Sequence, residues 1–120
     1  MKFLEVETEK QKKYISNEIT LMKSLKHPNI LKIDDAIMHQ NTMYMFMEFM
    51  DGGALTDIII NKERAELGFN ENVISYILLQ VGNGISYLHK NNIIHRDIKS
   101  DNILLKRKSN DVKICDFGYA

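Results

Sequence analysis

The chain has 120 residues, of which 44% are hydrophobic and 27% charged, as is ordinary for one folded domain. This composition excludes a disordered tail, a collagen-like fibre and a low-complexity segment. Sixteen Lys and Arg residues balance sixteen Asp and Glu residues, so charge gives no reason to expect binding to nucleic acid or to a membrane surface. The single Cys115 excludes an internal disulfide, and one Cys with four His residues makes no zinc-ligand cluster.

No targeting or membrane signal is evident in the sequence. No apolar run approaches the roughly 20 residues that a membrane span needs. The N-terminal segment is too acidic for a signal peptide. These features predict a cytoplasmic protein without a membrane span.

The first half of the chain predicts a helix followed by two strands. Apolar residues recur at helical spacing over residues 14–25, and His27-Pro28 follows as a stop signal. Residues 30–37 predict a strand. Residues 42–50 predict a second strand. This strand is apolar on both faces except at Glu48, so it is expected to be central in a sheet or covered on both faces.

The second half predicts two helices and a hairpin. A short helix is expected over residues 55–60 and a long one over residues 71–89, with Asn70 as the N-cap. The long helix carries one apolar stripe, part of which this chain is expected to leave uncovered; its residues are Val73, Ile74, Ile77, Leu78, Val81, Ile85 and Leu88. Residues 103–105 and 112–115 predict an antiparallel hairpin. The order of elements indicates an α+β fold.

Four polar residues surround this predicted hairpin. Asn102 directly precedes the first strand and Asp116 directly follows the second, so antiparallel pairing brings both to the same end. Asp97 and Lys99 lie on the loop that leads into the hairpin. Carboxylate and amide oxygens suit Mg²⁺, which commonly bridges a few protein oxygens to phosphates.

The motif His95-Arg96-Asp97-x-Lys99-x-x-Asn102, followed by Asp116-Phe117-Gly118, resembles the catalytic loop and metal-binding turn of a eukaryotic protein kinase. The resemblance implies that Asp97 accepts the proton of a substrate hydroxyl. It implies that Lys99 offsets charge on the transferred phosphoryl group, as in kinases specific for Ser and Thr. Asn102 and Asp116 would hold Mg²⁺ on the phosphates of ATP.

Either motif alone fits a solvated polar loop or an ordinary turn. Both motifs in this order, with a hairpin between them, favour the kinase interpretation. His95 is expected to be a core residue rather than a base.

The resemblance extends to the N-terminal segment. Glu18 falls on the apolar face of the first predicted helix, and Lys2 precedes it by sixteen residues, a separation similar to that of the kinase Lys–Glu pair. This pair would position the α- and β-phosphates of ATP. The alternatives are a rim Glu18 that faces water and an N-terminal Lys2 without significance.

A kinase hinge is implied after the second predicted strand. Met47 would lie behind the adenine, and Glu48 and Met50 would offer backbone hydrogen bonds to its edge. Leu104 would pack beneath the base. The resemblance therefore implies a kinase-like two-lobed fold, incomplete, with residues 1–47 in the small lobe, 48–53 in the hinge and 54–120 in the large lobe.

Sequence strings such as Lys99-Ser100-Asp101-Asn102 look like the PAK branch of the sterile-twenty kinases. That resemblance implies a protein substrate with Ser or Thr, and a small Rho-type GTPase acting through a region absent here. The glycine-rich loop and the later helices are also missing, so this chain alone is expected to be poorly stable and inactive. Its alternatives are a non-catalytic binding module, a pseudogene product and a small-molecule phosphotransferase; the motifs Lys99 and Asp116-Phe117-Gly118 argue against the last.

Overall fold

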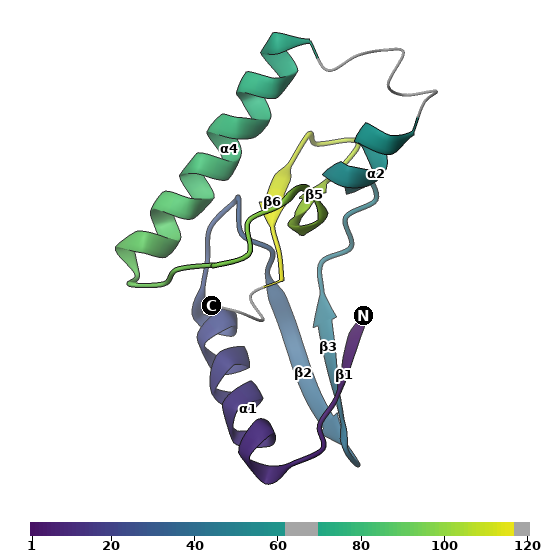
Figure 1. The fold of residues 1–120 in the computed structure, drawn as a ribbon, viewed down its shortest axis with the longest axis vertical. Helices are drawn as coiled ribbons and strands as arrows, with labels where there is room; N and C mark the ends of the chain where they lie inside the picture. Colours follow the sequence, from purple (N-terminus) through teal and green to yellow (C-terminus); the bar gives the residue numbers. More distant parts are fainter. Residues whose placement is uncertain (62–69, 117–120) are drawn as a thin grey trace. The chain divides into compact units, whose positions relative to one another are not determined.

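The computed structural model describes residues 1–61 and 70–116, and the chain divides into two compact units. The first unit comprises Met1–Lys26 and Leu31–Phe49, and the second comprises His27–Ile30 and Met50–Ala120. The elements of both units are drawn in Figure 1. Within residues 1–61 and 70–116, no helix combines the length and the apolar character needed to cross a membrane.

The first unit contains a three-stranded antiparallel sheet in the order β1-β3-β2. Its strands are β1 (Lys2–Glu5), β2 (Ile33–His39) and β3 (Thr42–Met47). The apolar pattern of β3 predicted a central strand or one covered on both faces, and β3 is the central strand of the sheet. β2 begins and ends later than the predicted range 30–37, and its turn to β3 places Gln40 at a positive φ of 52°.

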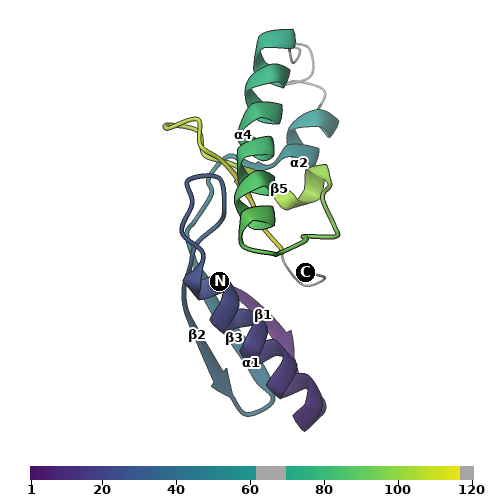
Figure 2. The same ribbon diagram turned by 90° about the vertical axis from the view of Figure 1, so that its left-hand side faces the viewer.

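Helix α1 (Glu9–Ser24) covers the sheet of the first unit, as Figure 2 shows. It begins five residues before the predicted start of 14, because Thr8 forms a capping box with Gln11. The Gln11 backbone N–H donates to Thr8 Oγ1 over 3.2 Å, and the Thr8 N–H donates to Gln11 Oε1 over 3.1 Å. The core beneath the helix consists of Val6, Ile19, Met43 and Met45.

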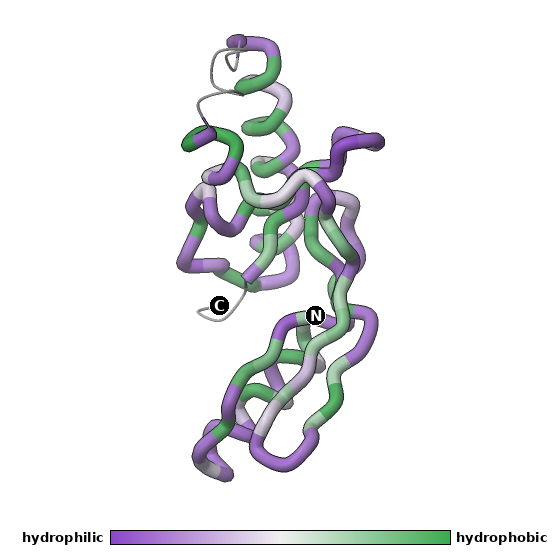
Figure 3. The backbone as a smooth tube through the Cα atoms, turned by 90° about the vertical axis from the view of Figure 1, so that its right-hand side faces the viewer, coloured by the Kyte–Doolittle hydropathy of each residue, from purple (hydrophilic) through white to green (hydrophobic). Residues whose placement is uncertain are grey.

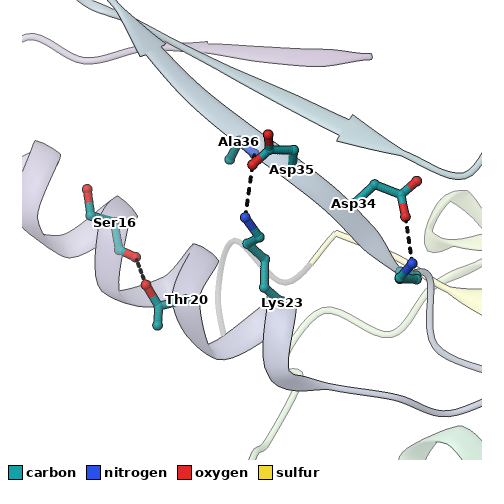
Figure 4. A network of polar contacts seen from close by, with 7 residues as sticks. Ser16, Thr20, Lys23, Asp34, Asp35 and Ala36 are labelled. Atoms are coloured by element: carbon teal, nitrogen blue, oxygen red, sulfur yellow. Dashed lines mark hydrogen bonds and ion pairs between the residues drawn. The ribbon is translucent and has the colours of Figure 1, made fainter.

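Polar contacts tie α1 to β2 at the surface of this unit (Figure 4). Lys23 Nζ lies 2.9 Å from Asp35 Oδ1, and the same oxygen accepts the Ala36 N–H over 2.8 Å. Both charged side chains are exposed to solvent, so the ion pair contributes little to the free energy of unfolding. The apolar cluster, rather than this pair, holds α1 on the sheet.

The second unit contains the predicted hairpin within a small sheet of order β4-β5-β6. Its strands are β4 (Gly53–Ala54), β5 (Ile103–Leu105) and β6 (Val112–Ile114), and Ile103 pairs with Ile114. Helix α2 (Leu55–Ile60) has the predicted bounds. A 3₁₀ turn, η1 (Ser100–Asn102), leads into β5.

Helix α4 (Glu71–Lys90) packs on β6, and Asn70 caps it by accepting the Val73 N–H over 3.0 Å, as predicted. Its buried residues are Ile77, Val81, Gly84 and Leu88. Val73, Ile74 and Leu78 of the predicted stripe are 40%, 44% and 64% exposed, so part of the apolar face of the helix is uncovered, as expected. The helix turns Gly84 toward β6, where the missing side chain lets the backbone approach closely.

The segment His27–Ile30 packs on β6 and α4, although the sequence predicted that a strand began at residue 30. Asn29 is 4% exposed; its Nδ2 donates to Val112 O over 3.0 Å and to Gln80 Oε1 over 2.8 Å. Asn29 O in turn accepts the Ile114 N–H over 2.9 Å. A buried amide with these partners fixes the segment against the sheet.

The His27 ring stacks on Tyr87 with a centroid separation of 4.7 Å. Its Nδ1 accepts the Asn29 N–H over 3.1 Å. Burial lowers the pKa of His27, which favours the neutral imidazole that this hydrogen bond requires.

The two glycines of α4 form a matched pair for testing this packing. A Cβ at Gly84 would lie 2.9 Å from Ile114 Cδ1 and 3.0 Å from Asn29 O, whereas a Cβ at Gly82 meets nothing within 4 Å. We expect Gly82→Ala to raise the free energy of unfolding by about 0.5–1 kcal/mol, through helix propensity. Gly84→Ala should fall about 1–3 kcal/mol below Gly82→Ala, because it overpacks the core. Urea unfolding followed by circular dichroism measures both values, and equal stabilities would contradict the packing.

Candidate functional site

The loop between α4 and η1 is organised around a buried histidine. His95 is 3% exposed, as expected of a core residue. Its Nδ1 accepts the Asp97 N–H over 3.2 Å, so its Nε2 carries the proton and donates to Cys115 O over 2.8 Å. Between these two bonds, Arg96 takes a positive φ of 67°. His95 therefore positions the backbone of Asp97 and ties the loop to the end of β6.

Asp97 is the centre of a cluster of polar contacts. Asp97 Oδ2 lies 3.1 Å from Lys99 Nζ and accepts a 3.1 Å hydrogen bond from Asn102 Nδ2. Asn102 Nδ2 also donates to the Asp97 backbone carbonyl over 2.9 Å. The Lys99 ammonium and the Asn102 amide together hold the pKa of Asp97 below its usual range. The carboxylate is therefore ionised at neutral pH and can accept a proton or hydrogen bond from a hydroxyl.

Asn102 and the end of β6 lie side by side, as the hairpin predicted. Asn102 is 4% exposed, and its backbone carbonyl accepts the Cys115 N–H over 2.9 Å. Asp116 follows Cys115 directly and takes a positive φ of 59°. Phe117 and Gly118, which complete the predicted motif, lie outside the described residues.

The donor set around Asn102 fits a hard cation. The bonds from Nδ2 to Asp97 fix the orientation of the carboxamide, so that Oδ1 is the atom of Asn102 suited to a metal. Asp116 adds a carboxylate from the adjacent strand end. One amide oxygen and one carboxylate are a suitable protein contribution to Mg²⁺ when phosphates and waters supply the remaining ligands. Over residues 1–61 and 70–116, no group of three or more His, Cys, Asp or Glu residues is arranged to hold a metal.

One contact that supports this cluster was missed by the sequence analysis. The hydroxyls of Thr56 in α2 and Ser100 in η1 lie 2.7 Å apart. This contact joins α2 to the turn that carries Asn102. Two hydroxyl residues 44 positions apart give no local sequence signal, so only the tertiary structure identifies the pair.

Four of the predicted nucleotide-site residues belong to the first unit. Lys2 is an exposed residue of β1 opposite Met45, and Glu18 is a half-buried residue of α1. Glu18 Oε1 is inaccessible to solvent, which argues against the alternative of a rim residue facing water. Met47 ends β3 and packs against the apolar cluster of this unit, and Glu48 follows it half-buried.

The remaining predicted residues belong to the second unit. Met50 is 6% exposed, and its carbonyl accepts the Gly53 N–H over 3.2 Å. Leu104 is the half-buried middle residue of β5 and pairs with Lys113 and Ala54. Leu104 therefore lies on the strand that Asn102 directly precedes.

A loop carboxylate held by Lys and Asn, beside an Asp at the end of a hairpin, is an arrangement suited to phosphoryl transfer. The sequence matches the family described as "Protein kinase domain" over residues 1–120. The chain belongs to the protein kinase family.

Individual relatives agree with this assignment. The chain is 39% identical over 119 residues to the serine/threonine-protein kinase shk1/pak1 of Schizosaccharomyces pombe, and 42% identical over 120 residues to CLA4 of Candida albicans. It is also 42% identical over 120 residues to shk2 of Schizosaccharomyces pombe. Each alignment covers 99% of this chain but only 17%, 12% and 19% of the respective relative. The chain thus resembles PAK-like Ser/Thr kinases and spans less than a fifth of their length.

Replacing Lys99 tests the electrostatics of the cluster. We expect Lys99→Met to raise the pKa of Asp97 toward its usual value of about 3.9, because the nearby positive charge favours the ionised form. The stabilisation from this pair is present above about pH 4 and disappears as the pH falls through the lowered pKa of Asp97. Carboxyl carbon NMR measures the titration directly. Lys90→Met, at an exposed position of α4, is the control and should leave it unchanged.

Proposed function

We propose that this chain supplies the phosphoryl-transfer centre of a PAK-like protein kinase, which transfers phosphate from MgATP to Ser or Thr hydroxyls. The observation that carries the proposal is the cluster in which Lys99 and Asn102 both contact Asp97 Oδ2, beside the strand end that leads to Asp116. The names of the PAK-like relatives support the Ser/Thr specificity.

In this proposal Asp97 orients the substrate hydroxyl and accepts its proton. The low pKa of Asp97 keeps the carboxylate ionised, and its contacts to Lys99 and Asn102 fix its orientation. The Lys99 ammonium offsets negative charge on the phosphoryl group in transit. Catalysis of this type depends on positioning and electrostatics, and the cluster supplies both.

Asn102 and Asp116 would hold Mg²⁺, and the bound ion would neutralise charge on the nucleotide phosphates. Lys2 and Glu18 form the ion pair that positions the α- and β-phosphates. Met47, Glu48, Met50 and Leu104 receive the adenine, as the kinase resemblance implies. Residues 1–47 then form the small-lobe part, 48–53 the hinge and 54–120 the large-lobe part of the kinase domain.

The substrate is proposed to be a protein carrying Ser or Thr, by analogy with relatives named as serine/threonine-protein kinases. Regulation by a Rho-type GTPase and a cytoplasmic location stay predictions.

Replacing the proposed base tests the assignment. The assay uses a chimaera in which residues 1–120 replace the matching segment of shk2, which is 42% identical over 120 residues. We expect Asp97→Asn to lower the rate of peptide phosphorylation by at least about a hundredfold, because the base is lost. The affinity for MgATP should be retained, since Asp97 is proposed to contact the hydroxyl rather than the nucleotide.

Asp101→Asn is the matched control for this variant. Asp101 is an exposed residue of η1 next to Asn102, and its replacement removes the same charge outside the Asp97 contacts. Equal phosphorylation rates for the parent and Asp97→Asn would overturn the role of Asp97. An inactive parent chimaera that is folded would favour the non-catalytic alternative.

Replacing Asp116 tests the metal assignment in the same chimaera. Asp116→Ala should weaken nucleotide binding in the presence of Mg²⁺ by about tenfold or more, because a carboxylate ligand is lost. Nucleotide binding in EDTA should change much less. Asp111→Ala, in the turn of the same hairpin, controls for a general loss of negative charge. Equal losses with and without Mg²⁺ would contradict the assignment of Asp116 as a metal ligand.

A further inference from the structure

The turn between β5 and β6 carries a serine directly after three basic residues. Residues 106–108 are Lys, Arg and Lys and precede Ser109, whereas no other Ser or Thr of the chain follows even two consecutive Lys or Arg residues. The turn forms a hydrophilic tip in Figure 3, and residues 107–110 are all exposed. It contains no residue of the Asp97 cluster, so the phosphoryl-transfer proposal gives Ser109 no role.

Contacts to the backbone hold this turn in place. Asp51 Oδ1 accepts the Arg107 N–H over 2.9 Å, and the Tyr76 hydroxyl donates to Asn110 O over 3.1 Å. Asp51 precedes β4 and Tyr76 belongs to α4, so the turn is attached to two separate elements. The side chains of residues 107–109 are exposed beyond these attachments. An exposed turn tip of this kind is a segment that another protein can reach.

The hydroxyl of Ser109 contacts a carboxylate of the same turn. Ser109 Oγ donates to Asp111 Oδ2 over 2.7 Å. Asp111 is the one acidic residue among residues 106–111, which carry a net charge of +2. A phosphate on Ser109 brings about −1.5 to −2 charges, which nearly cancels this net charge and puts two anionic groups where a hydrogen bond was. Phosphorylation here therefore changes both the charge and the hydrogen bonding of the turn.

The basic side chains before Ser109 also supply a recognition signal. Protein kinases discriminate among substrates by charge pattern, and basic residues before a serine suit a kinase whose peptide site is lined by carboxylates. Arg107 and Lys108 are exposed, so they can enter such a site together with Ser109. After the transfer, the same two cations are near enough in the chain to form charge-assisted hydrogen bonds with the phosphate.

We propose that Ser109 is a phosphorylation site for a Ser/Thr kinase that selects basic residues on the N-terminal side of the serine. In the transfer, a bond forms between Ser109 Oγ and the γ-phosphorus of ATP, and the bond from that phosphorus to the β–γ bridging oxygen breaks. ADP leaves, and the hydroxyl proton passes to a base of the modifying kinase. The proposal does not depend on the role of Asp97, because the modifying kinase supplies its own catalytic residues.

The test uses the full 120-residue chain as a substrate. The chain is incubated with MgATP and the catalytic subunit of cyclic-AMP-dependent protein kinase, which is directed to basic residues, and mass spectrometry locates the modified residues. Casein kinase 2, which is directed to acidic residues, is the control kinase, and a reaction without added kinase gives the background. We expect the basic-directed kinase to modify Ser109 at least about tenfold faster than casein kinase 2 does, and faster than it modifies any other Ser or Thr.

Two variants that each remove one positive charge test the recognition signal. Arg107→Ala removes a charge two positions before Ser109 and keeps the backbone N–H that donates to Asp51. Lys90→Ala removes the same charge at an exposed position of α4 and is the matched control. We expect Arg107→Ala to lower the rate at Ser109 at least about fivefold and Lys90→Ala to leave it unchanged. Circular dichroism checks that each variant is folded.

A synthetic peptide of residues 104–112 separates the accessibility of the folded turn from its local sequence. The peptide carries the same basic residues without the surrounding fold. We expect kcat/KM for the chain to lie within about tenfold of the value for the peptide, because the turn tip is exposed.

Three outcomes would overturn the proposal. The first is that Ser109 of the folded chain is not phosphorylated, whether or not the peptide is modified. The second is that the two kinases modify Ser109 at equal rates. The third is that Arg107→Ala and Lys90→Ala have equal effects while both variants remain folded.

Discussion

The candidate site depends on the antiparallel pairing of β5 with β6. Because Ile103 pairs with Ile114, the residues just outside the pair meet, and Asn102 O accepts the Cys115 N–H over 2.9 Å. The Asn102 side chain then fixes the position of the loop that carries Asp97, because its Nδ2 donates to Asp97 O and Oδ2. The His95 ring also joins the loop to the end of β6, because it donates to Cys115 O and accepts the Asp97 N–H. A short hairpin thus determines where a carboxylate, an amide and a second carboxylate are found.

The hairpin is itself stabilised by residues distant in sequence. Asn29 satisfies backbone groups of Val112 and Ile114, and Gly84 lets α4 approach β6 closely enough to cover Ile114, which is 0% exposed. A buried hairpin of three-residue strands has few ladder bonds of its own, so these additional contacts matter for its order. The geometry of the Asp97 cluster therefore depends on the packing of Asn29 and α4 against β6.

The same hairpin serves two surfaces at its two ends. One end carries Asn102 and leads to Asp116, where phosphoryl transfer is proposed. The other end is the turn in which the basic residues 106–108 precede Ser109.

The sequence by itself determined the α+β class, the family, the central position of β3, the bounds of α2, the Asn70 cap and the hairpin that brings Asn102 to the end of β6. The family follows from the resemblance of the motifs around Asp97 and Asp116 to those of protein kinases. The other features follow from local periodicity, capping or turn chemistry, which neighbouring residues specify. Only the tertiary structure decided which face of α4 is buried, because Gly84 contributes through the absence of a side chain and an apolar stripe does not reveal it. The same holds for the Thr56–Ser100 contact and for the attachment of Asn29 to β6. These interactions join residues far apart in the chain, and their geometry is set by packing rather than by any local pattern.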